Sequence, residues 1–183
     1  MFSNLVNQLG VNGVWFACIL GAAYGHAWLG SACAFVWIGW TLHRHANWRR
    51  ELGVVLFAGA LGFVADLVLI PVGRLAYVGQ PPGVPGPLWI VALWMAFGTS
   101  LNVSLAWLHG RAWLAAILGA ISGPLAYLAG RKLGAVVFGP PDREPLLVLS
   151  IVWAIALPLL VIVAARAHPQ GPDVPQKAHA DAT

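Results

Sequence analysis

The stretch Leu52–Val72, LGVVLFAGALGFVADLVLIPV, contains a single charged residue, Asp66, in an otherwise continuous apolar run. A helix of about 20 such residues is long enough to cross the roughly 30 Å of hydrocarbon in a bilayer. The rest of the 183-residue chain has the same character, because 60% of its residues are hydrophobic. Only 9% are charged, compared with about 25% in an ordinary soluble domain. The composition therefore predicts an integral membrane protein and excludes a water-soluble globule.

Charge-poor windows like this one divide the chain into about six transmembrane helices of one all-α bundle. Residues 1–43 contain no Asp, Glu, Lys or Arg and are about twice as long as one span, so we expect a turn near residues 21–26. The proline-rich run at 81–87 cannot lie inside a helix, and it separates the third span from the fourth. The expected spans are Asn4–Ala23, Ala27–Leu42, Leu52–Val72, Leu88–Leu108, Ala112–Gly130 and Pro145–Ala165.

Small residues recur every four positions in three of these spans, where they line one face of a helix and let a neighbouring backbone approach closely. The three faces consist of Gly13, Ala17 and Gly21, of Ala58 and Gly62, and of Ala115, Gly119 and Gly123. This pattern predicts one tightly packed transmembrane domain over residues 1–166. The polar, proline-containing tail at 167–183 is predicted to be disordered.

The basic residues indicate how the bundle is oriented, because cytoplasmic loops carry the excess of Lys and Arg. The side that holds both termini receives Arg44, Arg49, Arg50, Arg111, Arg166 and Lys177, and the other side receives Arg74, Arg131, Lys132 and Arg143. We therefore expect both termini in the cytoplasm, and we read the basic pI as a topology signal that does not indicate nucleic-acid binding. Four residues of the first basic loop are expected to anchor it on lipid headgroups, namely Arg44, Trp48, Arg49 and Arg50.

Asp66 is the candidate functional residue, because an ionised carboxylate inside a bilayer costs on the order of 3 kcal/mol unless something compensates for it. The fourth span carries a polar patch with Thr99, Asn102 and Ser104, which can hydrogen-bond a neighbouring carboxyl group. We predict that Asp66, Asn102 and Ser104 face one another inside the bundle, with Tyr127 nearby. Two interpretations stay open, a proton- or ligand-binding carboxyl group and a buried polar contact that sets helix register.

The sequence contains none of the motifs typical of membrane enzymes, such as histidine boxes, a glycine-rich phosphate loop or a nucleophile elbow. Cys18 and Cys33 lack metal-ligand spacing, and the pair His43 and His45 points to different faces of a helix. We therefore expect no metal and no cofactor. The absence of these motifs argues against an enzyme without excluding one.

Several segments resemble a known family: Gly10–Ala22, Asp66–Val68, Pro87–Trp89, Thr99–Asn102 and Gly123–Gly130. They are similar to a proteobacterial family of multi-span inner-membrane proteins of unknown function, domain of unknown function 2878, over most of the chain up to about Ile162. The resemblance implies a small helical bundle in the bacterial inner (cytoplasmic) membrane and a link to envelope lipids, but no activity. The chain carries Val103 where the family pattern implies a histidine, which argues against a proton relay or a metal at that point.

These observations favour a small transporter or a protein that binds a lipophilic small molecule, with a cavity that reaches one membrane interface and with the helices interrupted by Pro124 and Pro158 as moving parts. The alternative is an accessory or structural membrane protein with a closed bundle, in which Asp66 only contributes to packing. A lipid-modifying enzyme is a third, less favoured class. Membrane lipids are the expected partners, and a homo-oligomer or a membrane-protein partner stays open.

Overall fold

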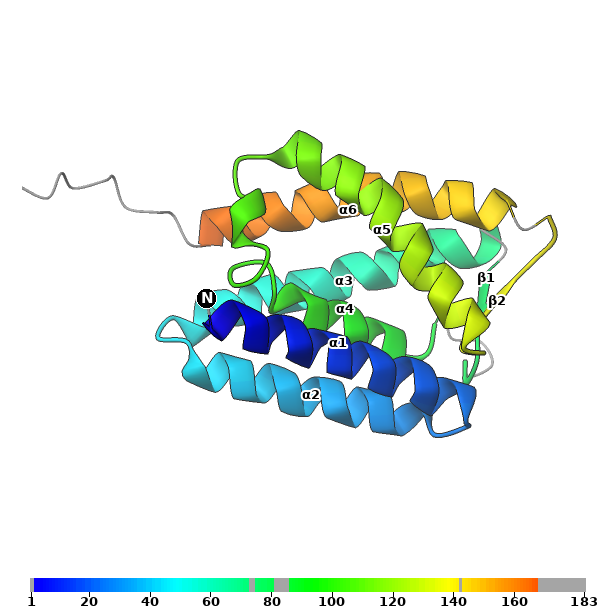
Figure 1. Ribbon diagram of the computed structural model, residues 1–183, viewed down its shortest axis with the longest axis horizontal. Coiled ribbons are helices and arrows are strands. Elements are labelled where there is room, and N and C mark those ends of the chain that lie inside the picture. Colours follow the sequence, from blue (N-terminus) through cyan, green and yellow to red (C-terminus); the bar gives the residue numbers. More distant parts are fainter. Residues whose placement is uncertain (1, 73–74, 81–85, 142, 168–183) are drawn as a thin grey trace, which may run out of the picture.

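The apolar segments form six α-helices among the residues that the structure, a computed structural model, describes: 2–72, 75–80, 86–141 and 143–167. The helices are α1 (Phe2–Ala23), α2 (Ala27–Arg44), α3 (Trp48–Val72), α4 (Leu88–Gly98), α5 (Ala112–Lys132) and α6 (Arg143–Ala167), with a short 3-10 helix η1 (Ala106–Leu108) and two strands, β1 (Leu75–Tyr77) and β2 (Val136–Phe138). Consecutive helices run in opposite directions along one bundle, so α1 begins and α6 ends at the same end (Figure 1).

The expected all-α membrane bundle is confirmed. Four helices are long and apolar enough to cross a bilayer, namely α1, α3, α5 and α6. Helix α2, with 18 residues, is not among them. Both α5 and α6 continue without interruption across Pro124 and Pro158. Most of the tail predicted to be disordered lies outside the described residues, as do Arg74 and residues 81–85 of the proline-rich run.

The predicted fourth span, Leu88–Leu108, is wrong, because α4 has only 11 residues and ends at Gly98. The hydroxyl groups of Thr99 and Ser100 donate to the carbonyl oxygens of Ala96 and Phe97, at 2.7 and 2.6 Å. The backbone N–H groups of the same two residues bond the same carbonyls, three positions back, instead of continuing the α-helical pattern. The polar patch that the sequence suggested as a stripe on a helix therefore terminates that helix.

The two strands are a feature that hydropathy did not predict. They pair antiparallel, with Leu75 opposite Phe138 and Tyr77 opposite Val136, and they join the segment after α3 to the segment after α5. Within β1 the side chains of Leu75 and Tyr77 are buried and that of Ala76 is exposed, as expected for a strand with one face on a core. The pairing therefore holds Tyr77 against the end of the bundle.

Small residues mark the closest helix contacts, as predicted, except at Gly13. A Cβ atom on Gly62 would overlap the Trp94 ring, and one on Gly119 would overlap the Trp153 carbonyl group. In the first face, a Cβ on Gly21 would lie 3.5 Å from the Gly30 nitrogen of α2. The prediction is wrong for Gly13, because no atom outside its own helix lies within 4 Å of the place its Cβ would take.

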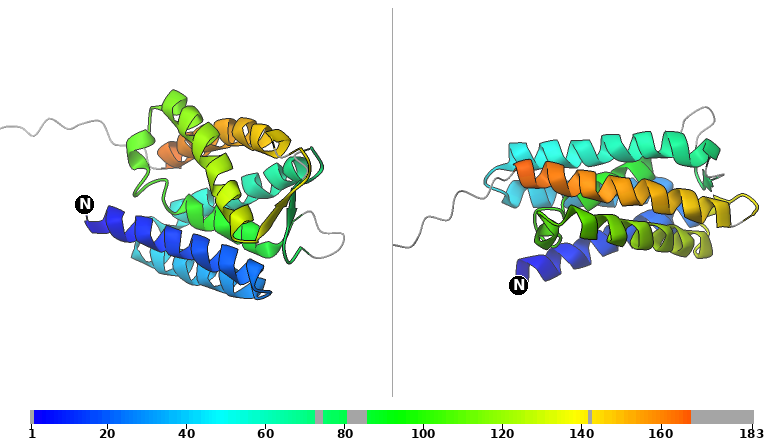
Figure 2. Two further views of the ribbon diagram at one scale, coloured as in Figure 1. Left: turned by 45° about the vertical axis from the view of Figure 1, so that its right-hand side comes forward. Right: turned by 90° about the horizontal axis from the view of Figure 1, so that it is seen from above.

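Helix α5 slants across the bundle, so its distance from α1 changes along its length (Figures 1 and 2). Its C-terminal end approaches α1, since a Cβ on Gly130 would lie 3.2 Å from Cδ1 of Ile19. Its N-terminal end packs near η1, away from the start of α1 (Figure 2). The two helices diverge from this point of contact.

Candidate functional site

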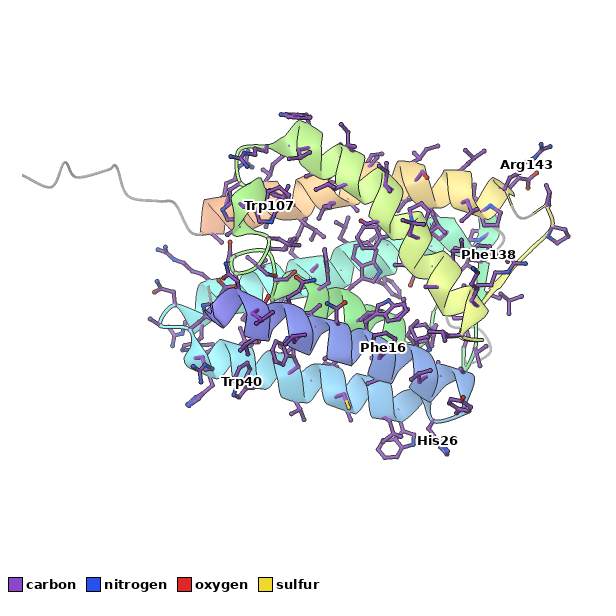
Figure 3. The ribbon with its side chains drawn as sticks, in the orientation of Figure 1. Phe16, His26, Trp40, Trp107, Phe138 and Arg143 are labelled. Carbon is purple, nitrogen blue, oxygen red and sulfur yellow. The ribbon has the colours of Figure 1, made fainter. Side chains whose placement is uncertain are left out.

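A cavity of about 510 Å³ lies where α1 and α5 diverge, with α4 behind it. We call it the lateral cavity. Its walls are largely aromatic, and they include Trp15 and Phe16 of α1, Trp89 and Trp94 of α4, Tyr127 of α5 and Trp153 of α6. Figure 3 shows Phe16 on the side of α1 that faces α5. Because Phe16 and Leu125 line the cavity and are 51% and 58% exposed, the cavity opens onto the outer surface between the two helices.

No charged side chain lines the lateral cavity within the part of the chain that the structure describes. Besides the indole groups of its tryptophans, its polar groups are the side chains of Gln8 and Asn12 on α1 and of Ser122 and Tyr127 on α5. Asn12 bonds its own helix, donating from Nδ2 to the Gln8 carbonyl oxygen at 2.7 Å. The cavity is thus suited to apolar or uncharged molecules, because a buried charge without a partner is strongly unfavourable.

Tyr127 connects this cavity to Asp66, which lies behind it and is only 1% exposed. The Tyr77 hydroxyl donates to Oδ1 of Asp66 at 2.7 Å, and its oxygen lies 3.4 Å from the Tyr127 hydroxyl. Oδ2 of Asp66 has no hydrogen-bond partner among the described residues. It lies in a tight space, since a Cβ on Gly86 would come within 3.2 Å of it.

Tyr77 is held in place by its hydrogen bond to Asp66 and by the ring of Trp89. Its ring meets the Trp89 indole edge to face at 5.7 Å, and Trp89 donates from Nε1 to the Val78 carbonyl oxygen at 3.1 Å. Burial, with Tyr127 and Asp66 as further causes, raises the pKa of the Tyr77 phenol well above its ordinary value of 10. The phenol therefore keeps its proton and remains a donor to Asp66.

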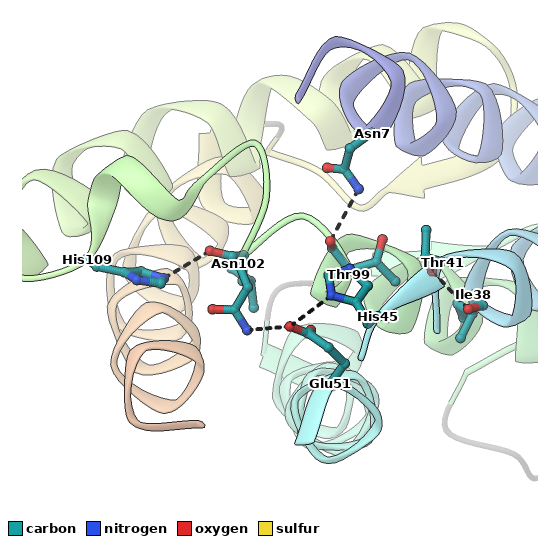
Figure 4. Close-up of polar contacts among 9 residues, drawn as sticks. Asn7, Ile38, Thr41, His45, Glu51, Thr99, Asn102 and His109 are labelled. Atoms are coloured by element: carbon teal, nitrogen blue, oxygen red, sulfur yellow. Dashed lines mark hydrogen bonds and ion pairs between the residues drawn. The ribbon is translucent and has the colours of Figure 1, made fainter. Parts of the chain in front are cut away.

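A second carboxyl group, that of Glu51, is buried in the first turn of α3, far along that helix from Asp66. Figure 4 shows its polar contacts. Its Oε1 accepts a hydrogen bond from Nδ2 of Asn102 at 3.1 Å and lies 3.8 Å from Nδ1 of His45. The neighbouring His109 ring contacts the Leu101 carbonyl oxygen at 3.0 Å. This cluster fixes the 99–105 segment against α3.

Asn7 of α1 joins the same segment from the other side (Figure 4). It donates from Nδ2 to the Thr99 carbonyl oxygen at 3.2 Å, and its Oδ1 accepts from the Ser104 hydroxyl at 2.8 Å. The Trp37 indole of α2 donates to Oγ1 of Thr99 at 3.1 Å. The predicted candidates Thr99, Asn102 and Ser104 therefore hold helices together, and none of them lines the lateral cavity.

The predicted encounter of Asp66 with Asn102 and Ser104 is wrong. Asn102 bonds Glu51, which precedes Asp66 by 15 positions on α3, or about 22 Å along a helix axis. The reason is register, because in antiparallel neighbours the late residues of α3 meet the early residues of α4. Asp66 accordingly lies beside Gly86, and only Tyr127 of the predicted set lies near it, through Tyr77.

Several residues of these clusters were not predicted from the sequence, among them Asn7, Glu51 and Tyr77. Glu51 directly precedes the expected span Leu52–Val72, and the available signal was an acidic residue beside a basic cluster. Tyr77 lies in a short segment without a long apolar run, and nothing in its neighbourhood predicts a partner 11 positions away.

The proposed headgroup anchors lie on the exposed surface around the α2–α3 connection. The guanidinium groups of Arg44 and Arg49 lie over the rings of Trp40 and Trp48, at 5.0 and 5.4 Å. Their role at a lipid surface stays a prediction. Within the described ranges, no three side chains of His, Cys, Asp or Glu come together as a metal site would require.

Comparison with known proteins supports the resemblance noted from the sequence. The family model described as "Protein of unknown function (DUF2878)" matches residues 4–159, which is most of the chain. Neither a curated protein nor a solved structure matches. The family description assigns no activity.

Proposed function

We propose that this chain, which belongs to the DUF2878 family, is a membrane protein that binds a lipophilic small molecule in the lateral cavity. The observation that carries the proposal is the cavity itself. Its volume of about 510 Å³ falls in the range of roughly 300–1,000 Å³ typical of small-molecule sites, which are mostly apolar with a few placed polar groups. Its opening between α1 and α5 faces the side of the bundle, where a ligand dissolved in the bilayer would enter.

Loose packing of the whole bundle does not account for the cavity. Helix α3 packs on α4 through Gly62 and Trp94, and α5 packs on α6 through Gly119 and Trp153, each without room for one methyl group. Protein interiors normally leave few voids larger than a water molecule. A cavity between two diverging helices, beside helix pairs that pack this closely, therefore favours a binding site.

The position of Asp66 changes the role that we propose for it. The carboxyl group does not line the cavity, so the group that would face a ligand is the Tyr127 hydroxyl, and Asp66 acts behind it through Tyr77. Binding is the requirement that a ligand-binding protein and a transporter share. The alternative is an accessory protein whose cavity is filled by ordinary acyl chains, with Asp66 as a packing contact.

We further propose an inner-membrane location with both termini in the cytoplasm. The beginning of α1 and the end of α6 lie at the same end of the bundle as the connection between α2 and α3 (Figure 1). Arg44 ends α2, and Arg49 and Arg50 lie in the first turn of α3. An excess of basic residues at one end is typical of the cytoplasmic side.

The proposal is tested by identifying what co-purifies with three forms of the protein. Ala126 lines the cavity from α5, whereas Ile121 on the same helix is 56% exposed and lies outside it. Ala126→Phe would project a phenyl ring into the cavity and obstruct it, and Ile121→Phe places the same side chain on the outer surface. We expect mass spectrometry of extracted lipids to find an enriched compound with wild type and Ile121→Phe but not with Ala126→Phe. Identical extracts that mirror the bulk membrane for all three would refute the proposal.

A further inference from the structure

We propose that the ligand of the lateral cavity is an uncharged, ring-bearing lipid whose carbonyl oxygen accepts hydrogen bonds from Tyr127 and Trp153. This inference deepens the proposed function and rests on it. Three independent features of the cavity carry it: the absence of charge in its lining, its unused donors and its aromatic walls.

The absence of charged side chains from the lining favours an uncharged ligand. Within the described residues the lining contains no Lys, Arg or His to compensate an anionic headgroup, and no Asp or Glu to compensate a cationic one. The nearest basic residue along α5, Arg131, lies one turn beyond Tyr127, and its guanidinium group stacks over Phe138 at 5.1 Å, outside the lining. Behind Tyr127 lies a carboxyl group, that of Asp66. A phosphate or carboxylate would thus meet no counter-charge.

The hydrogen-bond donors beside the cavity favour a ligand that carries an oxygen acceptor. Tyr77 has one hydroxyl proton, and it donates that proton to Asp66 at 2.7 Å. Tyr127 can then bond Tyr77 only with its own proton, at 3.4 Å, which is well beyond the 2.7–2.8 Å typical of hydroxyl hydrogen bonds. An oxygen acceptor in the cavity would bind that proton at a shorter distance.

A second donor is unused beside the first. The indole nitrogen Nε1 of Trp153 is buried and makes no hydrogen bond of normal geometry among the described residues; the group it approaches is the Tyr127 hydroxyl, with which it interacts only weakly. Trp153 also lines the cavity. Buried polar groups are normally paired, and leaving a donor unpaired costs about 1–3 kcal/mol. One carbonyl oxygen has two lone pairs and can serve both donors.

The aromatic side chains that line the cavity favour a ligand with a ring. The indoles of Trp94 and Trp153 are stacked at 4.3 Å with an interplanar angle of 13°, and Phe97 meets Trp153 edge to face at 5.8 Å. These rings cannot adapt to a flexible chain as freely as aliphatic side chains can. A rigid ring offers flat contact with aromatic faces and loses less conformational freedom on binding than an acyl chain does.

The probe for the test is a benzoquinone with a ten-carbon alkyl tail, because a quinone quenches indole fluorescence on contact and the cavity is lined by tryptophans. Two competitors are used. An alkylbenzene with the same tail but no carbonyl tests the hydrogen bond, and the fatty acid of matching length tests the exclusion of charge. The protein is the full chain in detergent micelles. Wild type, Tyr127→Phe, Ala126→Phe and Ile121→Phe are compared.

We expect saturable quenching with wild type and Ile121→Phe, and none with Ala126→Phe. Tyr127→Phe keeps the ring and removes the hydroxyl group, and we expect it to weaken quinone binding about tenfold. The alkylbenzene should compete with wild type only at about tenfold higher concentration, and the fatty acid should not compete.

The outcomes separate this inference from the proposed function. Equal binding of the quinone and the alkylbenzene, or competition by the fatty acid, would overturn the proposed ligand class. The proposed function would still be supported if binding is saturable and Ala126→Phe blocks it. Quenching that is non-saturable and unchanged in Ala126→Phe would refute both. The competition series uses wild type alone, so it decides the ligand class even if Tyr127→Phe fails to fold.

Discussion

The contact between α5 and α6 provides a stringent test of the fold. At Gly119 a Cβ atom would overlap the carbonyl oxygen of Trp153 and lie 2.9 Å from its carbonyl carbon and 3.1 Å from Cβ of Leu157. Ordinary contacts begin near 3.4 Å. Because two of the three nearest atoms are backbone, no side-chain rotation can relieve the overlap, and Gly119→Ala must push the two helices apart.

The magnitude follows from two opposing effects. Overpacking of a well-packed core costs typically about 1–3 kcal/mol. Replacing a helical glycine by alanine removes a penalty of up to about 1 kcal/mol. We therefore expect Gly119→Ala to lower the free energy of unfolding by about 1–2 kcal/mol. The matched control is Gly13→Ala in α1, where no foreign atom lies within 4 Å, and we expect it to leave stability unchanged or slightly raised.

The assay is reversible unfolding in mixed detergent micelles with increasing sodium dodecyl sulfate, followed by far-UV circular dichroism. The difference between the two variants isolates the helix contact from the intrinsic effect of alanine. If Gly119→Ala proved as stable as Gly13→Ala, the close approach of α5 and α6 at this position would be refuted, and with it the assignment of the 115–123 small-residue face.

Three further predictions concern the buried polar groups. Tyr77→Phe removes the donor to Asp66, and we expect the free energy of unfolding to fall by about 1–3 kcal/mol in the same assay. In an alkaline titration we expect the free energy of unfolding of wild type to fall above about pH 10, by up to roughly 1.4 kcal/mol per pH unit. The reason is that the unfolded chain then loses a phenolic proton that folded Tyr77 retains. We expect a smaller slope in Tyr77→Phe. Asn102→Ala leaves Glu51 without its amide donor, and we expect the free energy of unfolding to fall by about 1–3 kcal/mol. A smaller decrease for Asn102→Gln, which keeps the amide, would attribute the effect to the hydrogen bond.

Much of the fold follows from the sequence because hydropathy is a local property. An apolar run such as Leu52–Val72 must be helical in a bilayer whatever surrounds it, since every backbone N–H and C=O group needs a partner. The four-residue spacing of small side chains likewise identified Gly62 and Gly119 as contact points, because it depends only on helix geometry. It failed at Gly13, because the spacing cannot say whether a second helix lies opposite.

The candidate site was only partly predictable. Asp66 was identified from the cost of burying a charged group, which is again a property of a single position, and Tyr127 was named only as its neighbour. Their connection through Tyr77 was not identified, because that residue reaches the site on a strand held by pairing with residues 136–138, some 60 positions away. The antiparallel register of α3 and α4, applied to the sequence, would have separated Asn102 from Asp66.

The sequence by itself determined which segments are helices, that they belong in a membrane and which residues are costly to bury. Only the tertiary structure decided where α4 ends, which groups pair with Asp66 and Glu51, and that α5 slants away from α1 to open the lateral cavity. The physical reason is the difference between local interactions and contacts between residues far apart in the sequence. Transfer from water to lipid is summed residue by residue along the chain, whereas a crossing angle and a register depend on side chains from several helices packing at once.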